Sequence, residues 1–197
     1  MALPKYDKSK RRRTFEQLPK GAYVIRIKGA KQEQNKSGSG SHLTIIFDIA
    51  EGEYAGFYMK QYESTGFEDK KWPNDATYYL NVPDDSSPEY VWTNWNTFFG
   101  DLEDSNNGYV FGGDLKTLKE KLLGGKFAIE QSPGDNGTVY DHTRLRWTCV
   151  ADDVRSGKPG KMPNDKLVNT TKGSTVPAPQ EAGFVPIPDD TDEELPF

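Results

Sequence analysis

Short stretches in which apolar residues recur at every second position constrain the fold of this chain more than any other feature. One runs from Tyr23 to Ile27, a second from Leu43 to Ile49 and another from Leu145 to Cys149. A period of two is the pattern of a half-buried β-strand. The glycine and serine run Ser37–Ser41 separates the first two stretches and predicts a hairpin loop. The sequence therefore predicts a mainly β fold, with Trp147 on the core side of its strand.

Two further strands complete the expected set. Phe127 and Ile129 predict a fourth strand, which the turn residues Pro133–Gly137 join to the fifth. A third strand is predicted at Phe57–Tyr62, after the turn signal Glu53–Gly56. The segment Gly66–Pro83 is long for a connection and has two interpretations. It forms a loop that closes over a ligand, or Tyr78 and Leu80 belong to a short edge strand.

The period changes between the third and fourth strands. Ser87-Pro88-Glu89 is a helix start, and an apolar stripe follows it. Asp114 is a suitable cap for a second, shorter helix that ends at Gly124. The first helix is expected to turn Val91, Trp95, Phe98 and Leu102 inward, and the second Leu115, Leu118 and Leu122.

The resulting order is three strands, one or two helices and two strands. This is the order of a five-stranded Greek-key barrel of the OB-fold type, although other small β-barrels share it. We expect this barrel at residues 21–153. A basic arm at 1–20 precedes it, and a flexible, disordered linker at 154–188, rich in glycine and proline, leads to an acidic tail at 189–197.

Charge is strongly ordered along the chain. Residues 1–36 hold 11 Lys/Arg against 3 Asp/Glu, whereas residues 181–197 hold six acids and no base. A basic head suggests a polyanionic partner, and an acidic tail suggests a basic protein surface or the head itself. Both ends also have a simpler interpretation as solubilising segments.

Several function classes are disfavoured. The longest apolar run is the four residues Ala22–Ile25, too short to cross a bilayer, and the basic N-terminus does not resemble a signal peptide. A cytoplasmic protein is expected. Cys149 is the only cysteine, and His42 and His142 are far apart in the sequence, so neither a disulfide, a zinc site nor a catalytic triad is indicated. We expect a protein that is not an enzyme and that has no cofactor or metal.

The outward residues of the expected strands favour binding of single-stranded nucleic acid, because cations follow phosphates while aromatic rings stack on unpaired bases. For the tyrosines, ordinary cross-strand packing is the alternative. The expected contact residues are Arg11, Arg12, Arg13, Arg26, Lys28, Tyr58, Lys60, Tyr62, Trp72, Arg144 and Arg146.

The C-terminal sequence carries a family resemblance. Glu193-Glu194-Leu195-Pro196-Phe197 is similar to the end of bacterial single-stranded DNA-binding proteins, in which aspartates precede Ile-Pro-Phe. Leu18–Tyr23 and Phe47–Gly56 resemble phage-encoded members of this kind.

The resemblance implies a protein, located in the host cytoplasm if it is phage-encoded, that coats single-stranded DNA without strong sequence preference during replication and recombination. It also implies recruitment of a polymerase, helicase or recombinase through the tail, and it leaves a homo-oligomer open. An adaptor whose barrel binds protein and an RNA-binding OB domain are the alternatives. The tail residues expected to bind partners are Asp189, Asp190, Asp192, Glu193, Glu194, Leu195, Pro196 and Phe197.

Overall fold

The computed structural model describes residue 5 and residues 16–38, 40–66, 70–134 and 137–168, and within them the fold is mainly β. One antiparallel sheet has five strands in the order β3-β2-β1-β4-β5. The strands are β1 (Gly21–Gln34), β2 (Ser41–Ile49), β3 (Thr77–Val82), β4 (Leu122–Pro133) and β5 (Val139–Cys149). β3 and β5 are the two edges of the sheet, and no ladder between them is recorded for the described residues.

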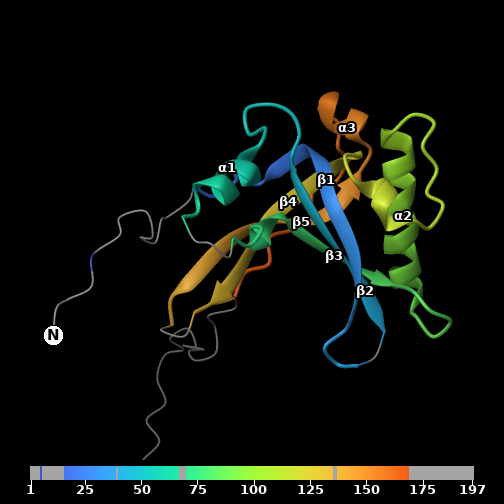
Figure 1. Cartoon of the computed structure of the whole chain (residues 1–197), viewed down its shortest axis with the longest axis horizontal. Helices are drawn as coiled ribbons and strands as arrows, with labels where there is room; N and C mark the ends of the chain where they lie inside the picture. Colours follow the sequence, from blue (N-terminus) through green and yellow to red (C-terminus); the bar gives the residue numbers. More distant parts are fainter. Residues whose placement is uncertain (1–4, 6–15, 39, 67–69, 135–136, 169–197) are drawn as a thin grey trace, which may run out of the picture.

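Among the described residues, three α-helices and two short 3₁₀ helices accompany the sheet. They are α1 (Phe57–Ser64), α2 (Glu89–Ser105), α3 (Ala151–Arg155), η2 (Asn74–Ala76) and η3 (Leu115–Leu118). In the view of Figure 1, α1 lies to the left of the sheet and α2 to its right, and α3 lies beside α2. Tyr58 of α1 and Phe98 of α2 belong to the same core. Within the described ranges, no helix is both long and apolar enough to cross a membrane.

The predicted alternation places one face of the central strands in the core. Ile25 and Ile27 of β1 and Leu43, Ile45 and Phe47 of β2 are all buried. Phe127 of β4 lies under the same face, with its ring centroid 5.8 Å from that of Phe47. The predicted hairpins β1–β2 and β4–β5 and the long helix after Pro88 are confirmed.

The third strand was predicted at the wrong place. Phe57–Tyr62 lies in helix α1, and the strand is instead β3, which includes Tyr78 and Leu80. Phe57–Tyr62 forms a helix because a side chain outside the segment caps its first turn. The buried carboxylate of Asp48, in β2, accepts hydrogen bonds from the backbone N–H groups of Ile49 and Tyr58, both at 2.9 Å. This satisfies an N–H group in the first turn of α1, which would otherwise lack a partner.

The second predicted helix is shorter than expected. Asp114 caps it by accepting from the backbone N–H of Lys116 at 2.9 Å, but only the 3₁₀ helix η3 forms. Glu120 then adopts a left-handed backbone with φ of 65°, which no helix continues through. Leu122 and Gly124 therefore belong to β4 and not to a helix.

The folded part of the chain extends past the predicted linker boundary at Val154. Helix α3 continues to Arg155. Further on, residues 165–168, which we call the strap, return to lie beside β4. The backbone of Lys166 donates to the carbonyl of Ile129 at 2.8 Å and accepts from the N–H of Gln131 at 2.9 Å. The strap thus continues along the edge of β4 that β1 leaves unpaired beyond Phe127.

Candidate nucleic-acid interface

A β-bulge in β5 shapes the candidate site. Phe127 pairs with Leu145 and Lys126 pairs with Trp147, so Arg146 is an extra residue without a counterpart in β4. A bulge of this kind shifts the alternation of side chains by one. Trp147 is consequently 44% exposed on the side of Lys126, and the prediction that it belongs to the core was wrong. The other tryptophan expected inside, Trp95, is partly buried against the core.

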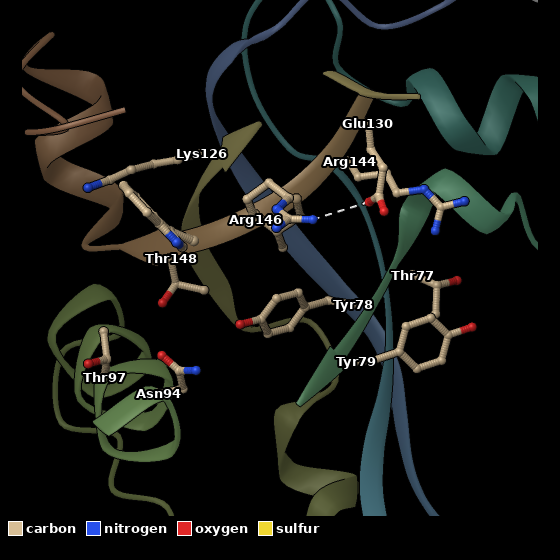
Figure 2. A pocket seen from close by; sticks show the side chains of 12 residues that line it. Thr77, Tyr78, Tyr79, Asn94, Thr97, Lys126, Glu130, Arg144, Arg146 and Thr148 are labelled. Carbon is tan, nitrogen blue, oxygen red and sulfur yellow. Dashed lines mark hydrogen bonds and ion pairs between the residues drawn. The ribbon is translucent and has the colours of Figure 1, made fainter. Parts of the chain in front are cut away.

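The bulge faces a groove of about 620 Å³ between the two edge strands and helix α2. In the view of Figure 2, Tyr78 of β3 faces Arg146, Lys126 lies beyond Arg146, Arg144 lies on the side of Thr77, and Asn94 and Thr97 of α2 lie near Thr148. The groove is lined by Thr77, Tyr78, Tyr79, Asn94, Thr97, Lys126, Glu130, Arg144, Leu145, Arg146, Trp147 and Thr148.

The groove carries three cations and one carboxylate among its lining residues. Arg146 Nη1 donates to Glu130 Oε2 at 3.2 Å, drawn as a dashed line in Figure 2. Lys126 forms no salt bridge with any residue that the structure describes. The hydrogen bond from Lys166 is the main cause that keeps the pKa of Glu130 below its usual range, so this carboxylate is ionised at neutral pH.

A chain of polar contacts holds the second arginine. Arg144 Nε lies 3.6 Å from Asp75 Oδ1, which is also 3.3 Å from Nδ1 of His142. Nε2 of the same imidazole lies 3.0 Å from the hydroxyl of Ser132. Asp75 belongs to η2, immediately before β3, so these contacts tie the start of one edge strand to the other edge. They fix the wall of the groove from which Arg144 projects.

Three aromatic residues line the groove together with the cations. Tyr79 of β3 is 53% exposed, comparable with Trp147. Tyr78 packs towards the core, where its ring stacks on Phe98 of α2 with centroids 6.0 Å apart and planes at 17°. Burial raises the pKa of the Tyr78 phenol, which therefore remains a neutral donor. Tyr79 and Trp147 are the exposed rings among the residues that line the groove, and the ring of Tyr79 also lies edge-on to His42, with ring centroids 5.6 Å apart.

Of the predicted contact residues that the structure describes, only Arg144 and Arg146 line this groove. Arg26 and Lys28 both reach Glu120, each at 3.4 Å, so they belong to a separate surface cluster. The prediction that Tyr58 presents its ring to a ligand was wrong, because only 2% of it is exposed and it packs against Phe47.

The remaining predicted residues near α1 also occupy other places. Lys60 donates to the carbonyl of Ala55 at 3.1 Å, and the rings of Tyr62 and Trp72 lie 5.5 Å apart. The indole N–H of Trp72 donates to the carbonyl of Phe47 at 3.2 Å. The arginines at 11–13 and the tail at 189–197 lie outside the residues that the structure describes.

Among the cationic and exposed aromatic residues that line the groove, Tyr79, Lys126 and Trp147 were not among the predicted contacts. Tyr79 could have been included from the edge-strand interpretation of residues 66–83, since it is the outward neighbour of Tyr78. Lys126 and Trp147 share a face only because of the bulge. Comparisons with known protein families and with curated proteins find no match to this chain.

Proposed function

We propose that this chain binds single-stranded DNA in the groove between β3, α2 and β5, on an OB-type barrel that is open between its two edge strands. The observation that carries the proposal is the convergence of Lys126, Arg144 and Arg146 with the exposed rings of Tyr79 and Trp147. The OB assignment is supported by five antiparallel strands with a helix between the third and fourth.

The chemistry of the groove suits unpaired bases better than a duplex. Three cations can follow a phosphate backbone, and each base stacked on an aromatic ring contributes about 1–3 kcal/mol. A duplex hides the faces of its bases and offers the rings little to stack on. Stacking and phosphate contacts carry little sequence information, so the binding is expected to tolerate any sequence.

The biological role follows from this activity together with the sequence of the tail. A protein of this kind coats and protects unwound strands during replication and recombination. The acidic segment 189–197 then recruits a polymerase, helicase or recombinase through complementary charge and its apolar end, Leu195-Pro196-Phe197. This role rests on the resemblance, since the tail lies outside the described residues.

The test is a titration of the full chain with oligo-dT, with duplex DNA and with RNA of equal length. Tryptophan fluorescence reports binding directly, because Trp147 lies in the groove. We expect quenching by oligo-dT that weakens with salt, and much weaker binding of duplex. Equal affinity for duplex would contradict the proposal, and a preference for RNA would change the ligand to that nucleic acid. Absence of binding would favour a protein-binding barrel.

A further inference from the structure

Glu130 is the one acidic side chain among the described residues that line the groove, and it lies between two cations from different parts of the chain. Its Oε2 accepts from Arg146 Nη1 at 3.2 Å, and its Oε1 accepts from Lys166 Nζ at 2.9 Å. The side chains of Glu130 and Arg146 are 23% and 37% exposed, whereas that of Lys166 is 64% exposed, so water screens the contact with Lys166 more than the contact with Arg146. Arg146 is thus already occupied by a carboxylate in the protein without DNA.

The strap fixes the position of Lys166. Besides the two backbone hydrogen bonds of Lys166, the carboxylate of Asp165 accepts from the backbone N–H of Ile129 at 3.0 Å and from Lys20 Nζ at 2.7 Å. Val168 N–H donates to the side chain of Gln131 at 3.2 Å. The strap is therefore held on both sides of Lys166, and its ammonium group stays within reach of Glu130.

We propose that Glu130 limits the affinity of the groove by competing with phosphate for Arg146, and that Lys166 weakens this competition by holding Glu130. This inference rests on the proposed function and identifies the residues that set the affinity of the same site. To bind the guanidinium group of Arg146, a phosphate must displace the Glu130 carboxylate, which is also negatively charged. Lys166 gives that carboxylate a second partner, so it is not left unpaired when Arg146 turns to the phosphate.

The consequence is that two surface residues with opposite charges shift affinity in opposite directions. Removing the charge of Glu130 frees Arg146 and removes a repulsive charge from the groove. Removing the charge of Lys166 leaves Glu130 with Arg146 as its nearest cation and strengthens the competing pair. The effect of Lys166 should depend on Glu130, whereas a lysine that acts only as a general positive charge would act independently of it.

The experiment is a double-mutant cycle measured by oligo-dT binding at low salt. We expect Glu130→Gln to bind about two- to fivefold more tightly than the wild-type chain and Lys166→Gln to bind more weakly by a similar factor. In the double variant, the loss caused by Lys166→Gln should disappear. Matched controls are Glu53→Gln, in the exposed turn before α1, and Lys161→Gln, which removes an exposed charge just before the strap.

The outcomes separate this inference from the proposed function. If the wild-type chain does not bind oligo-dT, the proposed function itself fails. If it binds but Glu130→Gln is no tighter than Glu53→Gln, the competition by Glu130 is refuted alone. If Lys166→Gln matches Lys161→Gln, or keeps its effect in the double variant, Lys166 does not act through Glu130. Circular dichroism of each variant confirms that the fold is retained.

Discussion

Replacing Lys126 by glutamine should change the salt dependence of DNA binding by a defined amount. Lys126, Arg144 and Arg146 are the cations of the groove, and Lys126 is the one without a salt bridge among the described residues. For a single strand, each neutralised phosphate contributes about −0.7 to the slope of log K against log salt. The three groove cations together therefore contribute about −2, which is roughly a 20-fold loss of affinity for a fourfold rise in salt.

Lys126→Gln should make this slope shallower by about 0.7, so the same rise in salt costs the variant roughly 2.6-fold less affinity than it costs the wild-type chain. Because other basic segments add to the total slope, the difference between variants is the quantity to measure. Fluorescence anisotropy of a labelled oligo-dT at several salt concentrations provides it. Lys119→Gln, on the exposed residue after η3, is the matched control. An unchanged slope for Lys126→Gln, or equal changes in both variants, would refute phosphate binding by Lys126.

Three other predictions concern separate parts of the structure. Tyr90 is 64% exposed and shares the α2 face of the groove residues Asn94 and Thr97, so Tyr90→Ala should weaken oligo-dT binding by about 1–3 kcal/mol, as measured by anisotropy. Trp92→Ala, from an exposed residue turned about 200° away on the same helix, should have little effect, and equal losses would contradict this placement. Tyr58→Phe should raise the free energy of unfolding in urea by about 1 kcal/mol, since the buried hydroxyl finds no hydrogen-bond partner among the described residues; a decrease would show that it has one. Burial raises the pKa of the Cys149 thiol to about 11, so the folded protein should react slowly with a thiol reagent at pH 8 and rapidly once unfolded. Because the folded state disfavours the thiolate, the free energy of unfolding of the wild-type chain should fall more between about pH 9 and pH 11 than that of a Cys149→Ser variant. An equal fall in both proteins would contradict the assignment.

The strands and the helix whose patterns depend on neighbouring residues were predicted correctly. The period of two in β1, β2 and β5 and the apolar stripe of α2 each depend on residues a few positions apart, and these elements form where they were expected. Two segments did not form as predicted: the second helix, where only η3 forms, and the segment from Phe57 to Tyr62. The aromatic residues of Phe57–Tyr62 suit a strand, but the carboxylate of Asp48, ten residues before Tyr58, caps the segment as a helix. A cap supplied across the fold leaves no local signal.

The candidate site could be predicted only in part for a similar reason. Arg144 and Arg146 were identified from their outward positions in β5, and both line the groove. The bulge at Arg146 depends on how β4 and β5 pair, which the sequence of β5 alone does not specify. Two adjacent glycines of β4 accompany it. A Cβ on Gly125 would lie 2.9 Å from Leu145 and Phe127, and one on Gly124 would lie 2.7 Å from the carbonyl of Cys149. Such close approach is visible only once the strands are paired.

Photo-crosslinking of oligo-dT that carries 4-thiothymidine to the full-length chain, with the attached peptides identified by mass spectrometry, tests the central claim most directly. We expect adducts on the exposed rings of the groove, Tyr79 and Trp147, and their loss when Arg144 and Arg146 are both changed to glutamine. Adducts confined to α1 around Lys60 and Tyr62, or to the cluster of Arg26 and Lys28, would contradict it and would place the DNA on another face of the protein.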